Sequence, residues 1–424
     1  MHYIWQHRLW RSEQMTTSAG ERVRVIDPGL LNTDAGPDFF NAKVEIDGHL
    51  WVGNVEMHER ATDWHRHHHD KDRAYDSVIL HVVGKDDCPV YRTNGELIPQ
   101  VVLEVSPHFT ESYEALVGSR TELPCAAQIR EVPHLVLTEW TEGLAFERLH
   151  GKVERIGHLL ELYHGSWEDV CYVTLARNLG FGINNDAFER LARSMPLRLL
   201  GKHSDSLLQL EALLLGQAGL LADAEAQQAD PYCRHLCQEW KFLANKFQLH
   251  PLEREAWKLF RIRPQNFPYR RIAMLAHYVE GGFGLMHAIL EAKGEQEMRD
   301  LFEVQLTGYW ANHYTFGKPN SRPSRALSDS SIDIVLINTV APLLYARGEL
   351  TGDYGMTDRA VNLLQDLKPE RNSIVTQFTW AGIDCPDALT SQALIELRRS
   401  YCEARKCIYC KIGHWLLTEA AHKL

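Results

Sequence analysis

The sequence contains no run of about eighteen apolar residues, which excludes a membrane-spanning helix. Its opening stretch, Met1 to Trp10, has no apolar core of the kind that a secretory signal peptide carries, and no lipidation motif. Nine cysteines among 424 residues are too few for a disulfide scaffold, and the number is odd. We therefore expect a cytoplasmic protein with reduced thiols and no membrane contact.

Positive charge is also in short supply. The chain has 45 lysines and arginines against 56 aspartates and glutamates, a formal net charge of −11. This balance argues against a broad, non-specific coat of nucleic acid but leaves a local basic groove open. What the sequence has in abundance is histidine: nine of its 22 histidines fall within the first 81 residues. The N-terminal region is therefore expected to be chemically specialised.

The chain changes character along its length. Residues 42–47 alternate with period two, residues 50–57 follow after a short hairpin-like connection, and residues 77–83 are almost continuously apolar. Farther along, apolar residues recur at helical spacing. We predict an α+β fold, with a β-rich mixed α/β domain at 1–125 that carries an Asp/Glu/His site. A larger, mostly α-helical domain at 126–424 carries the C-terminal cysteines.

An Asp/Glu/His constellation lies on the predicted strands. Asp38 comes just before one strand, and Glu56 and His58 lie on the next and share a face, because side chains on a strand alternate. We predict that these three residues are catalytic and bind Mg²⁺, Mn²⁺ or Zn²⁺, a cation that activates water for attack on a phosphodiester. His81, inside an apolar strand, needs a hydrogen-bond partner or a metal. The residues predicted to add ligands or to orient them are Asp63, His67, His69 and His81.

Several motifs carry a resemblance to a known family. The N-terminal ones are Gly-Pro-Asp-Phe at 36–39, Gly-Asn-Val-Glu-Met-His at 53–58, Asp-Trp-His-Arg-His-His-His at 63–69 and Val-Ile-Leu-His-Val-Val at 78–83. Later ones are Arg-Pro-Gln-Asn-Phe-Pro at 263–268, Asn-Thr-Val-Ala-Pro at 338–342 and the cysteines near the C-terminus. With these motifs the chain resembles a bacterial family of unknown function along essentially its whole length. That resemblance implies no activity.

The N-terminal part has a weaker resemblance to the PD-(D/E)XK nucleases. In those enzymes an Asp on one strand and an (Asp/Glu)-x-Lys pair on the next hold Mg²⁺ and position water. Asp38 and Glu56-x-His58 are similar to that pattern, which implies a nuclease-like sheet. The chain departs from the pattern at His58, where the nucleases have lysine.

Three cysteines, Cys402, Cys407 and Cys410, follow C-x4-C-x2-C spacing after the last helical pattern. At 3.6 residues per turn, Cys402 lies about 140° round a helix from Cys407, so one unbroken helix cannot wrap all three around a metal. Four thiolates suit zinc or an iron–sulfur cluster, and three thiolates with an imidazole suit zinc. The alternative is that these are ordinary buried small residues. The candidates for a fourth ligand are Cys385, His414 and Cys125.

A group of arginines near Pro264 points to a possible nucleic-acid partner, because guanidinium groups bind phosphate through paired hydrogen bonds. The residues predicted for this contact are Arg261, Arg263, Arg270 and Arg271. The alternative is that they join helices by pairing with carboxylates.

Three functions fit these observations. The first is a metal-dependent hydrolase, a nuclease-like phosphodiesterase that acts on nucleic acid. The second is a non-enzymatic scaffold that binds RNA or protein, in which the polar network and a metal are structural. The third is an enzyme of nucleotide or tRNA metabolism that uses the cysteine-held metal.

Overall fold

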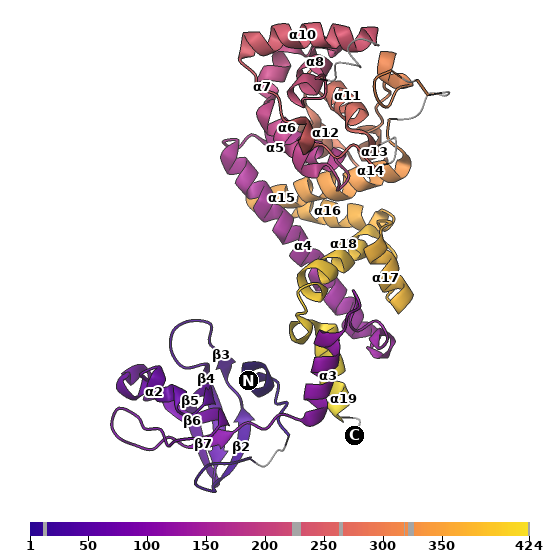
Figure 1. The fold of residues 1–424 in the computed structure, drawn as a ribbon. Helices are drawn as coiled ribbons and strands as arrows, with labels where there is room; N and C mark the ends of the chain where they lie inside the picture. The colour runs from indigo at the N-terminus through magenta and orange to yellow at the C-terminus, as the bar shows by residue number, and fades with distance from the viewer. Residues whose placement is uncertain (12–14, 223–229, 263–265, 318, 321–325, 423–424) are drawn as a thin grey trace. The chain divides into compact units, whose positions relative to one another are not determined.

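The computed structural model describes the chain except residues 12–14, 223–229, 263–265, 318, 321–325 and 423–424. Helices make up 55% of it and strands 12%, with a sheet region followed by a helical domain, so the predicted α+β class is confirmed. The chain divides into two compact units, each described by itself: unit 1 is Met1–Trp140 with Arg398–Leu424, and unit 2 is Thr141–Leu397 (Figure 1). Every described helix is too short or too polar to cross a lipid bilayer.

The division differs from the predicted domains in one respect. Residues 398–424 belong to unit 1, with the N-terminal sheet, and not to the helical part of the chain. Helix α19 (Lys411–His422) packs on α3 (Pro107–Gly118), and Leu417 joins the hydrophobic core beneath the sheet. The reason is a long-range apolar contact, which sequence patterning along the chain does not reveal.

Unit 1 is built on a seven-stranded sheet in the order β1-β2-β4-β5-β6-β7, with β3 paired to β4. Pairing is antiparallel from β1 to β5 and parallel from β5 to β7. The switch follows from the connections: a tight turn at Asp47 and Gly48, both with positive φ, joins β4 to β5, whereas the chain crosses over through α2 to reach β6. The strands are β1 (Met15–Thr16), β2 (Arg22–Asp27), β3 (Leu30–Leu31), β4 (Phe39–Ile46), β5 (His49–Arg60), β6 (Val78–Lys85) and β7 (Gln100–Val102).

The register of the central strands positions the candidate site. The first six residues of β6 are buried, as its continuous apolar pattern predicts for a strand covered on both faces. Glu56 on β5 lies beside His81 on β6, and Phe39 lies beside Val55, which brings Asp38 next to Glu56. The other helices of unit 1 are α1 (His2–Gln6) and α2 (Asp63–Arg66), with short 3-10 turns at His69–Lys71, Arg73–Tyr75, Ile129–Glu131 and Cys407–Tyr409.

Unit 2 is helical. Side-chain oxygens of Ser166, Ser206, Asp230 and Asn372 accept backbone N–H groups at helix starts, which satisfies donors that have no partner within the helix. Helix α4 (His134–Leu162) begins in unit 1. The remaining helices are α5 (Trp167–Leu179), α6 (Asn185–Ser194), α7 (Leu197–Leu200), α8 (Leu207–Gln217), α10 (Pro231–Phe247), α11 (Pro268–Val279), α12 (Leu285–Glu291), α13 (Glu295–Asp300), α14 (Asp329–Val335), α15 (Ala341–Thr351), α16 (Tyr354–Asp366), α17 (Ser373–Ala381) and α18 (Ala388–Glu396).

A buried ion cluster joins three helical segments of unit 2. Glu189 on α6 is 8% exposed and accepts hydrogen bonds from Arg155, from Arg177 at 2.7 Å and from Arg193 at 2.6 Å. Burial opposes ionisation of this carboxyl, but the hydrogen bond from Arg155 and the three guanidinium charges outweigh it, so its pKa is lowered.

We expect Glu189→Gln to lower the free energy of unfolding at pH 7 by about 2 kcal/mol, because charged hydrogen bonds are lost. A lowered folded-state pKa gives stability that is present above the ordinary value of 4.5 and lost as pH falls through the lowered value. The difference between variant and wild type in denaturant unfolding should therefore shrink in acid. Glu161→Gln, at a side chain 83% exposed, is the control, and an equal loss there would contradict the assignment.

Candidate metal centre

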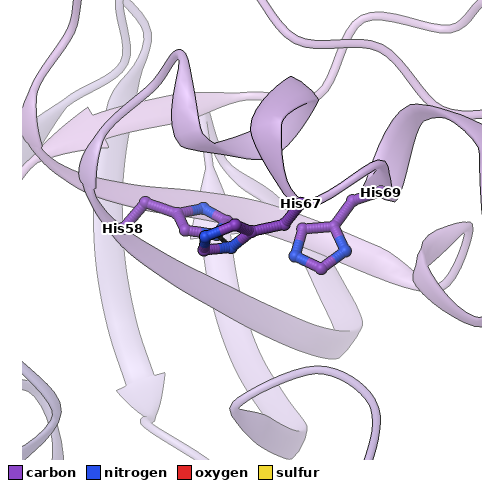
Figure 2. A group of neighbouring side chains, drawn as sticks. All are labelled: His58, His67 and His69. Carbon is purple, nitrogen blue, oxygen red and sulfur yellow. Dashed lines mark hydrogen bonds between the residues drawn. The ribbon is translucent and has the colours of Figure 1, made fainter.

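Three histidines converge at one end of the central strands. His58 comes from β5, whereas His67 and His69 come from the segment after α2, and one ring nitrogen of each lies within 4.8 Å of the others (Figure 2). His58 and His69 are buried and His67 is exposed, so the group opens to solvent on the side of His67.

Local backbone geometry explains why two members of the His65 to His69 run reach His58. Helix α2 ends at Arg66, and His68 adopts a left-handed conformation with φ of +62°. This turn lets residues 67 and 69 face the same side while residue 68 points elsewhere. The ring of His69 then stacks on Tyr75 with centroids 3.7 Å apart, which fixes its orientation.

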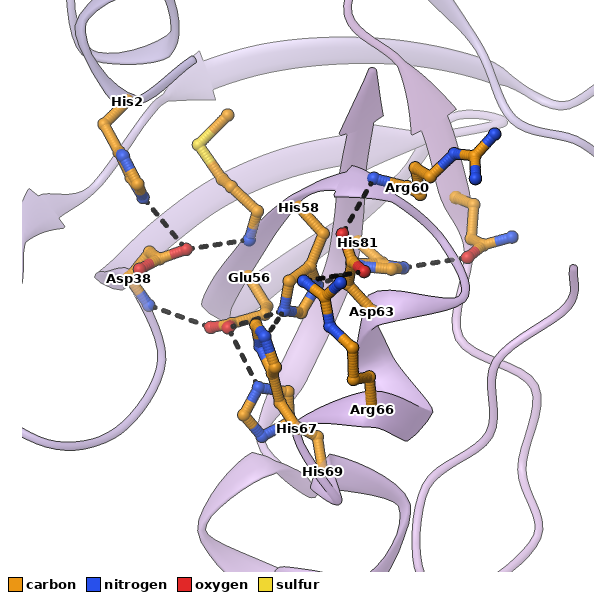
Figure 3. A network of polar contacts seen from close by, with 12 residues as sticks. His2, Asp38, Glu56, His58, Arg60, Asp63, Arg66, His67, His69 and His81 are labelled. Carbon is orange, nitrogen blue, oxygen red and sulfur yellow. Dashed lines mark hydrogen bonds and ion pairs between the residues drawn. The ribbon is translucent and has the colours of Figure 1, made fainter. Parts of the chain in front are cut away.

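The Glu56 carboxylate lies beside two of the three histidines. Its Oε1 lies 3.6 Å from His58 Nε2 and 3.4 Å from His69 Nε2, and His58 Nε2 lies 3.1 Å from His67 Nδ1 (Figure 3). Four ligands in a tetrahedron around zinc, each about 2.0 to 2.1 Å from the ion, are about 3.4 Å apart. The 3.1 Å between His58 Nε2 and His67 Nδ1 is close to that spacing, and the three histidines can therefore serve as ligands of one tetrahedral ion, with Glu56 beside them.

A buried chain of hydrogen bonds fixes the proton positions on His58. Gln100 Nε2 donates to Asp86 Oδ1 at 3.1 Å and to the Cys88 carbonyl at 2.9 Å, which orients the amide so that Oε1 faces His81 Nδ1 at 2.8 Å. His81 therefore carries its proton on Nδ1, and its Nε2 accepts from His58 Nδ1 at 2.8 Å. His58 Nε2 is left with a lone pair directed at the group, as a metal ligand requires.

The electrostatics of the site also favour a cation. Burial and the neighbouring Asp38 charge raise the pKa of Glu56 to about 8. Burial, reinforced by the other histidines, lowers the pKa of His58 to about 3, and burial lowers that of His81 to about 4. The pKa of His69 is lowered as well, first by burial. The imidazoles of His58 and His81 are therefore uncharged at neutral pH, and a bound cation would stabilise ionised Glu56.

Asp38 lies beside Glu56 and is held by backbone contacts. Its N–H donates to Glu56 Oε2 at 3.1 Å, and its Oδ2 accepts from the N–H of Met57 at 2.9 Å. The same oxygen lies 3.1 Å from Nε2 of His2 on α1. These contacts make Asp38 a partner that orients Glu56 from the edge of the histidine group.

Two of the predicted ligands have other partners. The Asp63 carboxylate accepts from the N–H of Arg60 at 3.3 Å and pairs with Arg66 at 3.1 Å, away from the histidine group. His81 is fully buried, and both of its ring nitrogens are used in the chain from Gln100 to His58. Both residues therefore lie outside the group formed by His58, His67 and His69, and His81 contacts that group through its hydrogen bond to His58.

The predicted arginine contact with nucleic acid is corrected as well. Arg270 and Arg271 on α11 are each 1% exposed, and their guanidinium groups lie over the rings of Tyr314 and Phe181. They pack inside unit 2 and are closed to a phosphate backbone. Among the described residues, the hydrogen bonds of Arg271 are with Met274, the Ala326 carbonyl and the Asn266 amide and not with a carboxylate. Arg261 is at the surface beside Phe260, and Arg263 lies outside the described residues.

The cysteine prediction also changes. Cys385 lies in unit 2, with its Sγ 3.7 Å from the carbonyl of Asp387, whereas Cys402, Cys407 and Cys410 lie in unit 1. His414 forms a 2.5 Å hydrogen bond with the Tyr3 hydroxyl. Of the three proposed fourth partners, only Cys125 lines the same cavity as the C-terminal cysteines.

Gln100 was missed by sequence reasoning. The one available signal is its polarity within the otherwise apolar run from Leu97 to Leu103, the same signal that singles out His81 in β6. Neither the pairing of Gln100 with His81 nor the role of Asp86 in orienting it follows from spacing along the chain.

The fold and site define an α+β protein with a clustered histidine–carboxylate centre on parallel strands. The chain belongs to the family described as "Protein of unknown function (DUF2851)", whose profile matches residues 1–373. This confirms the resemblance to a family of unknown function, and the match includes the whole histidine group. No curated protein and no solved structure matches the chain, and the nuclease resemblance is not confirmed.

Gln100→Leu should weaken zinc binding by about 10- to 100-fold, because His81 loses the acceptor that fixes its proton and hence that of His58. Isothermal titration with zinc measures the effect. The matched control is Gln209→Leu, which removes a 2.7 Å hydrogen bond to His203 in unit 2. Unchanged zinc affinity in folded Gln100→Leu would refute the orienting role.

Proposed function

We propose that this chain is a zinc-dependent hydrolase that cleaves a phosphodiester bond of nucleic acid. The observation that carries the proposal is the close spacing of these donor atoms. Glu56 Oε1 lies 3.6 Å from His58 Nε2 and 3.4 Å from His69 Nε2, and His58 Nε2 lies 3.1 Å from His67 Nδ1. Three imidazoles leave one position of a zinc tetrahedron for water, as catalytic zinc sites require.

The donor set selects among the metals that the sequence suggested. Mg²⁺ prefers oxygen ligands in an octahedral arrangement, whereas imidazole nitrogen suits zinc and other late transition metals. With three imidazole nitrogens as ligands and the Glu56 carboxylate beside them, zinc is the metal that these residues fit best.

Each residue then has a distinct role. His58, His67 and His69 would hold the zinc, and a zinc ion there would lower the pKa of a bound water to about 7 and so supply hydroxide at neutral pH. Glu56 lies beside two of the histidines and accepts the proton that this water loses. His81 and Gln100 fix which ring nitrogen of His58 carries the proton, and Asp38 orients the Glu56 carboxylate.

A phosphodiester is the substrate class that the placement of the acidic residues supports. Asp38 precedes β4 and Glu56-x-His58 lies on the adjacent strand β5, the arrangement by which the chain is similar to the PD-(D/E)XK nucleases. The lysine of that pattern is replaced by His58, and a zinc ion would supply the positive charge that stabilises the reacting phosphate.

Nine free cysteines support a reducing compartment such as the cytoplasm.

We expect His67→Ala to weaken zinc binding at least about 100-fold, because one of three imidazole ligands is lost. His65→Ala is the matched control: His65 is in the same run but faces Asp70, 3.7 Å away, and its loss should leave affinity within about twofold. Isothermal titration of both variants checks this. Equal weakening by the two substitutions would contradict the proposed ligand set.

The Glu56→Gln variant distinguishes a hydrolase from a non-enzymatic scaffold in which the polar network is structural. If Glu56 is the proton acceptor, the zinc-loaded variant should remain folded and retain zinc within about tenfold, but hydrolyse phosphodiesters at least about 100-fold more slowly. Rates are measured on bis(4-nitrophenyl) phosphate, single-stranded DNA and RNA. If zinc-loaded wild type cleaves none of these, the hydrolase proposal fails. A variant that loses several kcal/mol of stability would support the scaffold instead.

A further inference from the structure

Four cysteines from two distant parts of the sequence line one small cavity of unit 1. Cys125 comes from the segment after α3, and Cys402, Cys407 and Cys410 come from the C-terminal segment. Leu116, Pro124, Tyr401 and Gly413 complete the lining. All four thiols are free, so the cavity holds no disulfide.

The backbone is shaped to bring the three C-terminal cysteines together. A π-helix at Leu397–Cys402 ends at the first of them, and Arg405 then adopts a left-handed conformation with φ of +53°. A 3-10 turn at Cys407–Tyr409 carries the second cysteine, and Cys410 immediately precedes α19. This is the helix break that one metal site for all three requires.

The start of α19 is packed tightly against this turn. A Cβ on Gly413 would lie only 2.1 Å from the carbonyl oxygen of Cys407, so any side chain there would force the two segments apart. The close approach also aims the backbone N–H groups of Ile412 and Gly413 at Cys410, where they favour the thiolate.

Two guanidinium groups lie near the thiols, outside the cavity lining: Arg398 pairs with Glu122 and Glu403, and Arg405 donates to the carbonyls of Ser119 and Thr121. Burial raises the pKa of Cys402 and of Cys407, while Arg398 and Arg405 respectively act to lower them. Burial raises the pKa of Cys125 to about 12. The N–H groups of Ile412 and Gly413 and the nearby guanidinium charges favour a bound, negatively charged cluster.

We propose that Cys125, Cys402, Cys407 and Cys410 bind an iron–sulfur cluster. A single zinc ion would hold its four sulfurs about 3.8 Å apart, given zinc–sulfur distances near 2.3 Å. Among the residues that the structure describes, only the His58, His67 and His69 group has three ligand atoms within 4.8 Å of one another. No three of the four sulfurs therefore lie as close together as one zinc ion requires, whereas an iron–sulfur cluster bears its thiolates on separate irons and accepts a wider spacing.

Binding of the cluster replaces four S–H bonds by four iron–sulfur bonds and releases the four thiol protons to solvent, with two ferrous ions, two ferric ions and four sulfides as the co-reactants. The cluster joins residues 398–424 to the chain that follows α3. It therefore cross-links the C-terminal segment to the rest of unit 1, and it does so independently of the histidine group.

The test uses the full chain purified without oxygen, or reconstituted with ferrous and ferric iron and sulfide. We expect about four irons and four sulfides per chain, with broad visible absorption that bleaches on reduction. Cys125→Ser and Cys407→Ser should each lower bound iron at least about tenfold, whereas the matched control Cys385→Ser, in unit 2, should leave it unchanged.

The wild-type result decides the question even if a variant fails to fold. A wild-type chain that takes up no iron and sulfide, or that carries zinc alone at these cysteines, would overturn the cluster. So would iron that is retained in folded Cys125→Ser or lost equally in Cys385→Ser. None of these results bears on hydrolysis at the histidine group, which is measured separately.

Discussion

The hydrogen bond between His58 and His81 is the interaction on which the candidate site depends. It joins two buried imidazoles across the parallel strands β5 and β6, where an unpaired ring nitrogen would be costly. Because Gln100 fixes the proton on His81, this bond also fixes the lone pair on His58 Nε2. The sheet register thus determines the chemistry of the site as well as its position.

Unit 1 also links the two candidate metal sites through its first helix. On α1, His2 contacts Asp38 beside the histidine group, and the adjacent Tyr3 bonds to His414 on α19, which follows Cys410 directly. The C-terminal segment packs in unit 1 and not with the helices that precede it in the sequence. It places a proposed cluster and a proposed catalytic zinc in the same compact unit, with one short helix in contact with the surroundings of both.

Much of the fold and part of the site followed from local sequence signals. Alternation and apolar runs predicted β4, β5 and β6, and the Glu56-x-His58 spacing correctly implied one shared face. The sequence predicted His67, His69 and His81 alike as ligands or orienting residues, and the structure distinguishes them: a left-handed His68 brings His67 and His69 to His58, while His81 is fully buried and hydrogen-bonds to His58. Such choices depend on single backbone angles and on contacts distant in sequence, which no periodicity encodes.

X-ray absorption spectroscopy of the full chain loaded with one equivalent of zinc tests the central claim most directly. The account predicts a zinc shell of nitrogen and oxygen only, at about 2.0 Å, with the outer scattering of three imidazoles. A shell containing sulfur at about 2.3 Å would place the zinc at cysteines, and a shell of water oxygens without imidazole would show that the histidine group does not bind it. Either result would contradict a zinc centre at His58, His67 and His69.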